Sequence, residues 1–216
     1  METLVVGAGA MGQWLARALE ADGPPTGIAF ADTDRSAARA AAHTLDGRAV
    51  PTDTEESFDA VCVAVPIPAA AEAIAAYAPL AEQAVYDVTG VMREPIAAMA
   101  EYAPERERVS FHPLFAPDNE PGNVPVVVHE PGPVTDAVRE TFAARGNDVF
   151  ETTAAEHDEA METVQARTHA AVLAYALTRE EVPDWYHTPI SKELGELADR
   201  VTAGEARVYA DIQAAF

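Results

Sequence analysis

Residues 3–19, TLVVGAGAMGQWLARAL, constrain the fold more than any other stretch of this chain. A short apolar run ends at Gly7, two more glycines follow at Gly9 and Gly12, and a helical pattern begins directly after them. With this G-x-G-x-x-G spacing between a strand and a helix, the first glycine permits a tight turn, the second lets the backbone approach a phosphate, and the third lets the helix pack closely on the strand. The stretch therefore predicts the first unit of a nucleotide-binding α/β sheet.

An acidic residue at a fixed distance narrows the choice of nucleotide. The N–H groups of Ala10 and Met11, at the start of the predicted helix, are placed to meet a pyrophosphate. Asp32 ends the next apolar run, twenty residues after Gly12, where a carboxylate accepts hydrogen bonds from both ribose hydroxyls and repels a 2′-phosphate. We expect NAD as the cofactor, and Arg35 keeps NADP as the less favoured alternative. The competing interpretation is an apolar glycine turn with Asp32 as a helix cap.

Short apolar runs alternate with helical patterns over roughly the first 150 residues. Runs of valine and alanine without polar alternation suit parallel strands that are covered on both faces. The pattern predicts an α/β fold with a Rossmann-type, doubly wound, mostly parallel sheet. The predicted strands are residues 3–6, 27–31, 60–65, 84–88, 108–112, 124–129 and 148–152, with 48–51 as an optional short edge strand. The predicted helices between them are residues 11–22, 36–45, 69–78, 94–103 and 134–146.

The sequence pattern changes near residue 152: from there on, helical patterns follow one another without apolar strand-like runs between them. We expect a dinucleotide-binding domain over residues 1–152 and a small all-helical C-terminal domain over residues 153–216. Its predicted helices are residues 153–177, 190–204 and 205–216. Thr152 or Thr153 is the expected N-cap of the first, with Glu156 three residues beyond Thr153. About sixty residues bury little surface alone, so we expect them to pack on the first domain or on a second copy, and we favour a homodimer.

Composition excludes several classes of partner. Lys+Arg 14 against Asp+Glu 36 gives 14 − 36 = −22, a charge that repels nucleic acid and anionic membranes. Lys192 is the single lysine, and this acidic, alanine-rich composition is typical of the cytosol of an extreme halophile. Cys62 lies in an apolar run and is expected to be an inert core residue. The apolar stretch 60–85 is interrupted by prolines and glutamates, so we expect no membrane span. We also expect no metal site, and we expect the protein to be cytoplasmic.

Three predicted strands end at residues that should converge. Ligands of such sheets bind outside the carboxyl ends of the strands, so we expect Val65 and Pro66 to line the cofactor site. Gly90 follows another strand, and His112 ends a third, facing the reactive end of the cofactor. His112 lies in SFHPLFAPD, residues 110–118, where two prolines give the loop a fixed shape. The alternative is a turn histidine without a role.

These motifs resemble the prephenate dehydrogenase family almost from end to end. The similar pieces are VVGAGAMG, DVTGVM, SFHPLFAPD, EHDEAMETVQARTHAAVLAYAL, TPISKELGEL and YADIQ, and HPLFAP is close to the His-Pro-Met-Phe-Gly-Pro of the family. The resemblance implies that His112 is the catalytic histidine and that His169 lies in the substrate pocket. Gln165 lies one turn before His169 on the same helix face.

The chain departs from the family pattern at three places. After DVT the family usually has Ser-Val-Lys, whereas this chain has Gly90, Val91 and Met92; the neighbouring Thr89 is the candidate to supply the missing hydroxyl to the substrate. Lys192 stands where the family usually has an arginine that grips the substrate. The chain also stops just past YADIQ, where relatives continue, so we expect a shortened helical domain.

The resemblance implies NAD-dependent oxidative decarboxylation of prephenate to 4-hydroxyphenylpyruvate, a step in tyrosine biosynthesis. A neutral imidazole suits the proton transfer of this reaction. Arogenate, which carries an amino group in place of the side-chain keto group, is the alternative substrate. A small reductase of the broader 6-phosphogluconate-dehydrogenase-like group would leave HPLFAP unexplained. A non-catalytic NAD-binding regulator is the alternative from a different functional class.

Overall fold

The computed structural model describes every residue except 24–26 and 204–205, and it divides the chain into two compact units. The first unit is Met1–His157 and the second is Asp158–Phe216. The division falls a few residues beyond the boundary expected after residue 152, so the first turn of the helix that follows the sheet belongs to the first unit.

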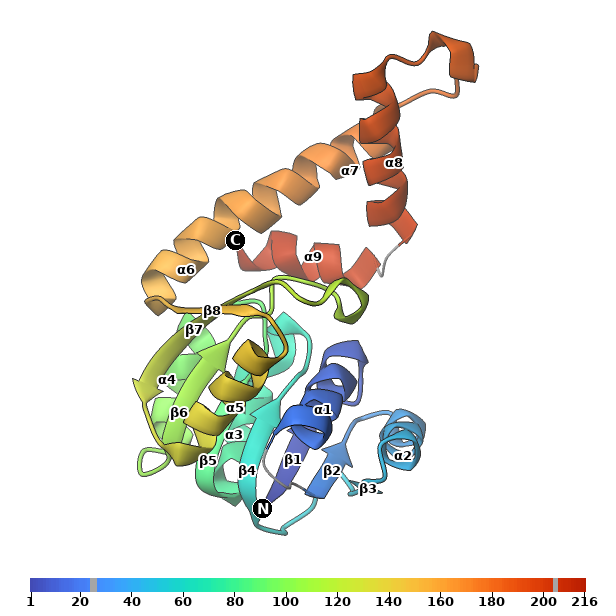
Figure 1. Cartoon of the computed structure of the whole chain (residues 1–216). Coiled ribbons are helices and arrows are strands. Elements are labelled where there is room, and N and C mark those ends of the chain that lie inside the picture. Colours follow the sequence, from blue (N-terminus) through green and yellow to red (C-terminus); the bar gives the residue numbers. More distant parts are fainter. Residues whose placement is uncertain (24–26, 204–205) are drawn as a thin grey trace. The chain divides into compact units, whose positions relative to one another are not determined.

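The first unit is built on an eight-stranded sheet with the order β3-β2-β1-β4-β5-β6-β7-β8 (Figure 1). Its strands are β1 (Glu2–Val6), β2 (Gly27–Ala31), β3 (Arg48–Ala49), β4 (Phe58–Val63), β5 (Ala81–Asp87), β6 (Glu107–Phe111), β7 (Asn123–Glu130) and β8 (Asp148–Glu151). Neighbouring strands are parallel except β6 and β7, which are antiparallel. The predicted doubly wound, mostly parallel α/β class is confirmed, and the optional edge strand is present as β3.

Helices cover both faces of this sheet. They are α1 (Ala10–Asp22), α2 (Arg35–Thr44), α3 (Ala70–Tyr77), α4 (Arg93–Tyr102) and α5 (Pro133–Ala144). Val5 of β1 packs in one core cluster with Trp14 of α1 and Phe142 of α5. Its neighbour Leu4 packs in a second cluster with Ile74 of α3. Because side chains alternate along a strand, the two clusters lie on opposite faces, which explains why the strands are apolar without polar alternation.

Cys62 behaves as its apolar surroundings predict. It lies in β4 with no exposed surface, and burial raises the pKa of its thiol well above the usual value. The thiol is therefore protonated at neutral pH, and a buried protonated thiol is a small apolar core group.

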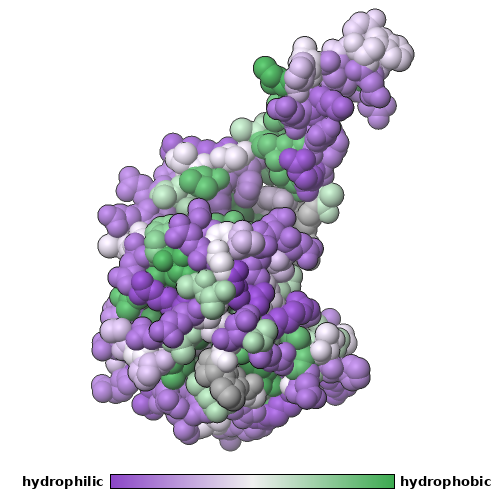
Figure 2. Space-filling view, in the orientation of Figure 1, coloured by the Kyte–Doolittle hydropathy of each residue, from purple (hydrophilic) through white to green (hydrophobic). Residues whose placement is uncertain are grey.

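Polar groups dominate the face of the molecule shown in Figure 2. Hydrophilic residues cover most of the face shown in Figure 2, as expected for a chain with 36 acidic and 14 basic residues. Among the helices of the described residues, none has the length and apolar character needed to cross a membrane.

The helical region contains one departure from the predicted pattern. Its helices are α6 (Ala154–Met161), a π-helical segment (Glu162–Arg167), α7 (Thr168–Thr178), α8 (Pro189–Ala203) and α9 (Ala206–Ala215). The predicted helix over 153–177 is thus continuous but widens in the middle. The Thr168 hydroxyl donates to the carbonyl oxygen of Thr163 at 3.0 Å, five residues earlier. α-helical partners are three or four residues apart, so this spacing favours the wider π turn. The predicted helix ends at 204 and 205 lie outside the described residues.

Candidate active site

The glycine turn between β1 and α1 has the geometry that its spacing predicts. Gly7 has a φ of +102°, and a Cβ atom there would lie 2.3 Å from the carbonyl oxygen of Ala64. A Cβ atom on Gly12 would lie 2.0 Å from the carbonyl oxygen of Gly7. Neither position admits a side chain. A Cβ atom on Gly9, by contrast, would meet nothing within 4 Å, so the turn leaves open space at its middle glycine.

Helix α1 begins at this open space without a side-chain cap among the described residues. Gly9 is the N-cap residue, and a glycine has no side chain that could accept from the first N–H groups of the helix, which include those of Ala10 and Met11. Ala10 is exposed and Met11 is partly buried. Uncapped N–H groups at the positive end of a helix suit a phosphate group.

Asp32 lies at the end of β2, beside the glycine turn. Its Oδ2 accepts a hydrogen bond from the N–H of Ala8 at 2.7 Å, and its Oδ1 accepts one from the N–H of Asp34 at 2.8 Å. The cap of α2 is Asp34, whose Oδ1 accepts hydrogen bonds from the N–H groups of Ser36 (2.8 Å) and Ala37 (3.3 Å). The alternative in which Asp32 is the helix cap is therefore wrong.

A pocket of about 150 Å³ lies between α2 and the β3 region. It is lined by Arg35, Ala38, Arg39, Ala49, Val50 and Pro51. Arg35 and Arg39 are four residues apart, so they lie on the same side of α2. Two arginines of α2 therefore contribute to the lining of this pocket.

The carboxyl ends of β4, β5 and β6 meet, as the sequence predicts. Val65 follows β4, and its Cγ1 atom lies 3.3 Å from where a Cβ atom on Gly7 would be. Pro66 follows and is the N-cap of a short 3₁₀ turn that contains Ile67. A Cβ atom on Gly90, after β5, would lie 2.9 Å from the Cδ1 of Ile67 and 3.7 Å from the Nε2 of His112. These three strand ends therefore surround one point next to the imidazole.

His112 directly follows β6 and is buried, with 7% of its surface exposed. Its Nδ1 atom lies 2.9 Å from the Nε2 atom of His157, which is 3% exposed. The two rings meet edge to face, with centroids 5.1 Å apart. The N–H of His112 also donates to the carbonyl oxygen of Pro125 in β7 at 3.1 Å. The backbone and the ring of His112 are both held.

His157 was given no role of its own in the sequence analysis, because it appears there only within the motif EHDEAMETVQARTHAAVLAYAL. The signal was nevertheless present in the predicted capping box. Thr153 Oγ1 accepts a hydrogen bond from the N–H of Glu156 at 3.2 Å, and the N–H of Thr153 donates to Glu156 Oε2 at 3.3 Å. A capping box directly after a strand of the sheet fixes where α6 starts. His157 lies one turn into that helix.

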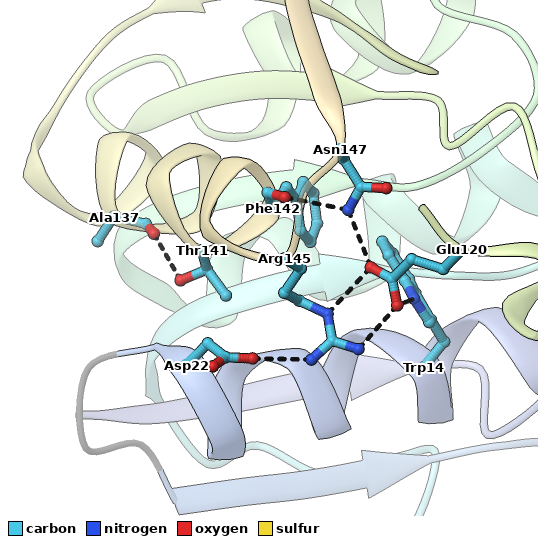
Figure 3. A network of polar contacts seen from close by, with 8 residues as sticks. All are labelled: Trp14, Asp22, Glu120, Ala137, Thr141, Phe142, Arg145 and Asn147. Atoms are coloured by element: carbon cyan, nitrogen blue, oxygen red, sulfur yellow. Dashed lines mark hydrogen bonds and ion pairs between the residues drawn. The ribbon is translucent and has the colours of Figure 1, made fainter. Parts of the chain in front are cut away.

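A polar network joins the loop after β6 to α1 (Figure 3). Glu120 Oε2 accepts hydrogen bonds from Trp14 Nε1 at 3.0 Å and from Arg145 Nη2 at 2.7 Å. Glu120 Oε1 accepts from Arg145 Nε and from Asn147 Nδ2, both at 2.9 Å. Arg145 also pairs with Asp22 at the end of α1, at 2.8 Å. The Arg145 guanidinium, followed by Asn147 and Trp14, lowers the pKa of Glu120 to about 2.

Thr89 is 4% exposed, and its hydroxyl is engaged within its own turn. The hydroxyl bonds the carboxylate of Asp87 and lies 3.1 Å from the carbonyl oxygen of Val91. The N–H of Thr89 donates to Asp87 Oδ2 at 2.9 Å. Both of these hydroxyl contacts lie within the turn that follows β5.

Three of the expected substrate-binding residues belong to the second unit. Gln165 lies in the π-helical segment, and His169 lies four residues later in the first turn of α7. The His169 ring packs edge to face on Tyr209 of α9 at 5.0 Å, and burial lowers its pKa, so this imidazole is neutral at pH 7. Lys192 is exposed in the first turn of α8.

Comparison with known proteins gives the family. The profile described as "Prephenate dehydrogenase, nucleotide-binding domain" matches residues 15–123, about half of the chain. The 4-amino-4-deoxyprephenate dehydrogenase of Streptomyces pristinaespiralis is 33% identical over 245 residues, which cover 98% of this chain and 76% of that protein. The T-protein of Haemophilus influenzae is 30% identical and covers 97% of this chain, which spans 54% of that longer protein.

Solved structures agree with this assignment. Prephenate dehydrogenase from A. aeolicus, in complex with hydroxyphenyl propionate and NAD+, has a TM-score of 0.76 at 18% identity and covers 98% of this chain and 81% of its own. Arogenate dehydrogenase from Synechocystis has a TM-score of 0.61 at 19% identity and covers 99% of this chain and 83% of its own. At these identities the structures establish the fold. Together with the profile match and the 33% identical relative, they show that the chain belongs to the prephenate dehydrogenase family.

Proposed function

We propose that this chain is an NAD-dependent dehydrogenase that converts prephenate to 4-hydroxyphenylpyruvate and CO₂. The observation that carries the proposal is the position of His112. Its buried imidazole lies at the carboxyl end of β6, beside Gly90 at the end of β5, where ligands of doubly wound sheets react. Membership of the prephenate dehydrogenase family supplies the substrate class.

The first unit offers groups that fit the cofactor. The nicotinamide group of bound NAD⁺ accepts a hydride in this chemistry. The open space at Gly9 and the uncapped start of α1 suit its pyrophosphate. The Asp32 carboxylate keeps acceptor capacity for ribose hydroxyls, because each oxygen has two lone pairs and accepts one short backbone hydrogen bond. A 2′-phosphate would meet this negative charge, so we propose NAD; Arg35 and Arg39 are the features that favour NADP.

His112 supplies the proton chemistry. Prephenate carries a hydrogen and a hydroxyl on ring carbon C4 and a carboxylate on the opposite ring carbon. As the C4 hydrogen leaves with its electron pair, an unprotonated nitrogen of His112 accepts the hydroxyl proton and the C4–O bond gains carbonyl character. Loss of the ring carboxylate as CO₂ returns an electron pair toward that oxygen, which takes back the proton as the phenol forms. A neutral imidazole suits this reversible transfer at neutral pH.

We propose that Gln165, His169 and Lys192 bind the substrate. The substrate carries two carboxylates, and a chain with 36 acidic and 14 basic residues has few cations to offer. Lys192 is the single lysine, and we propose that it takes the place of the arginine with which the family usually grips the substrate. An ammonium makes a point contact, whereas a guanidinium would make a two-pronged one. Thr89 contributes through the shape of its turn, since its hydroxyl is engaged by Asp87.

We propose that the second unit packs against a second copy of the chain. Several of its large apolar side chains are exposed, with Leu177 at 85% and Trp185 at 80%. The others are Val164, Val182, Tyr186, Ile190 and Val208. Exposed apolar groups that gather into one patch mark a protein interface, and we propose that these residues do so. Light scattering in molar salt should show a dimer, and a monomer of 22.9 kDa would contradict this proposal.

The charge of the chain supports a cytoplasmic location at high ionic strength. A net charge of −22 destabilises a compact state by self-repulsion, and salt screens that repulsion. The use of arginine thirteen times and lysine once fits the same environment. Stability that rises between low and molar salt would support this location.

A second candidate substrate is 4-amino-4-deoxyprephenate, in which an amino group replaces the C4 hydroxyl. A relative that bears this name is 33% identical over 98% of the chain. The observation that favours it is Gly90, which stands where the family usually has a serine. A Cβ atom there would lie 3.7 Å from His112 Nε2, so the glycine removes a hydroxyl next to the imidazole. Arogenate differs from prephenate only in the side chain, away from this point.

A turnover assay decides among these substrates. The purified chain is mixed with NAD⁺ in high salt and, separately, with prephenate, arogenate or 4-amino-4-deoxyprephenate, and NADH absorbance is followed. Turnover of prephenate at the highest kcat/KM is the expected result. Preference for the amino compound would select the second candidate. Absence of NADH with all three would contradict the proposed function.

A further inference from the structure

We propose that His157 is a positioning residue for His112: it accepts the Nδ1–H of His112 and thereby directs the unprotonated Nε2 toward Gly90 and the reaction site. The proposal deepens the proposed function and rests on it for the identity of the reaction. The two rings are within hydrogen-bond distance, since His112 Nδ1 and His157 Nε2 are 2.9 Å apart.

The tautomer of the pair follows from what a base requires. A neutral imidazole carries one N–H, so the hydrogen between Nδ1 of His112 and Nε2 of His157 belongs to one ring or the other. If His157 donated it, the hydrogen of neutral His112 would sit on Nε2, which then has no lone pair for a proton. If His112 donates it, Nε2 is an acceptor. Only the second arrangement leaves a base at the nitrogen beside Gly90.

Burial strengthens the hydrogen bond between His112 and His157. Both rings are under a tenth exposed, so bulk water competes poorly for the Nδ1–H. When His112 takes up a proton it becomes a cation, and a hydrogen bond from a charged donor is roughly twice as strong as a neutral one. His157 therefore also stabilises the imidazolium that forms during the reaction, as the orienting partner does in other imidazole-based sites.

The start of α6 holds His157 in place through backbone and packing contacts. The N–H of Thr152 donates to the carbonyl oxygen of Val126 in β7 at 2.9 Å. Arg93, at the start of α4, donates from Nη2 to the carbonyl oxygen of Ala155 at 3.1 Å. Ala154 packs on a small core cluster formed by Met92, Ile96 and Val127. The imidazole is thus placed by the same unit of the structure that carries His112.

The departure of this chain at Gly90 makes such a partner useful. A serine at this position would bring a hydroxyl to the Nε2 edge of His112, because its Cβ atom would lie 3.7 Å away. Gly90 brings none, and the hydroxyl of Thr89 is engaged by Asp87. Orientation from the Nδ1 side, through His157, does not depend on either hydroxyl.

Two substitutions and one control test the proposal. His157→Leu removes the acceptor, His157→Gln keeps an amide oxygen that can accept the Nδ1–H, and His43→Gln removes an exposed histidine of α2. We expect His157→Leu to lower kcat about 10- to 100-fold, below the total worth of a positioned base, with KM and NAD⁺ affinity within about twofold of wild type. His157→Gln should recover part of the loss, and His43→Gln should match wild type.

A spectroscopic readout separates this proposal from the proposed function. In ¹⁵N-histidine spectra, the signals of His112 are those that disappear in His112→Asn, and their couplings show which nitrogen carries the hydrogen. We expect an Nδ1–H tautomer in wild type and in His157→Gln, and a shift toward Nε2–H in His157→Leu. An Nε2–H tautomer in wild type, or the same tautomer in wild type and His157→Leu, would overturn the proposal. The measurement needs no substrate, so a chain that fails to turn over prephenate still gives a decision here.

Discussion

Glu120→Gln is the substitution for which the structure gives the clearest magnitude. The carboxylate accepts two hydrogen bonds from Arg145 and one each from Asn147 and Trp14. A glutamine keeps the shape and part of the hydrogen bonding. It removes the negative charge and turns an NH₂ group toward a donor. We expect the variant to fold and to be destabilised.

The size of the effect follows from the pKa of Glu120, which lies at about 2 in the folded chain against the usual 4.5. At about 1.36 kcal/mol per pKa unit, this difference corresponds to roughly 3 kcal/mol at neutral pH. Glu120 is 10% and Arg145 23% exposed, so solvent screening is limited. We expect a loss of about 2–3 kcal/mol, or roughly 4–12 °C in Tm at about 2–4 °C per kcal/mol.

The sign of the pH dependence is fixed because the folded pKa is depressed. The stabilisation is fully present above about pH 4.5 and is lost as the pH falls from there toward about 2. The difference between parent and Glu120→Gln should therefore be largest at neutral pH and shrink in acid.

Urea unfolding is the suitable assay, because urea adds no ions that would screen the pair. The chain has two tryptophans, Trp14 in the network and Trp185 in the second unit. In a Trp185→Phe background, Trp14 fluorescence reports on the first unit alone. Glu101→Gln, at an exposed position of α4, is the matched control for loss of one carboxylate. Equal stability of Glu120→Gln and Glu101→Gln, or a difference that does not change between neutral pH and acid, would refute the reasoning.

Three further substitutions test the site. His112→Asn should keep the fold and NAD⁺ affinity but lower turnover by roughly 10²–10⁴-fold, and near-wild-type turnover would make His112 a turn residue only. Asp32→Ser should narrow the preference for NAD⁺ over NADP⁺ in cofactor titrations, because it removes the charge that repels a 2′-phosphate; an unchanged ratio would contradict this role. Lys192→Ala should lower kcat/KM for prephenate about 10- to 100-fold, because it removes a charge-assisted hydrogen bond to the substrate. The affinity for NAD⁺ should not change. A kcat/KM within about twofold of wild type would show that Lys192 is a surface residue.

Features that depend on residues close in the chain were predictable from the sequence. The glycine turn follows from the spacing of Gly7, Gly9 and Gly12, and the capping box from Thr153 and Glu156. Apolar runs bounded by turns located the strands, since a buried parallel strand leaves little room for polar residues. The convergence of strand ends then follows from the topology of any doubly wound sheet.

Contacts between distant residues were not predictable in the same way. Trp14 and Glu120 are 106 residues apart, and His112 and His157 are 45 apart. With 36 acidic residues in the chain, sequence alone offers many partners for any one arginine, and only the folded sheet selects Glu120 for Arg145. The contact of the Thr89 hydroxyl with Asp87 was not predicted either, because it depends on a turn geometry that the sequence does not encode.

The order of the strands has a consequence for how the chain can fold during synthesis. β2 and β3 add on one side of β1. β4 pairs with the other side of β1, and each strand from β5 to β8 then adds beside the strand made before it. No later strand has to insert between two earlier ones, so a growing chain exposes one advancing edge while the part already made stays paired. Exposed edges are where strands from different chains pair wrongly. The contacts from Glu120 and Arg145 to α1 join the segments just before β7 and β8 to the first helix.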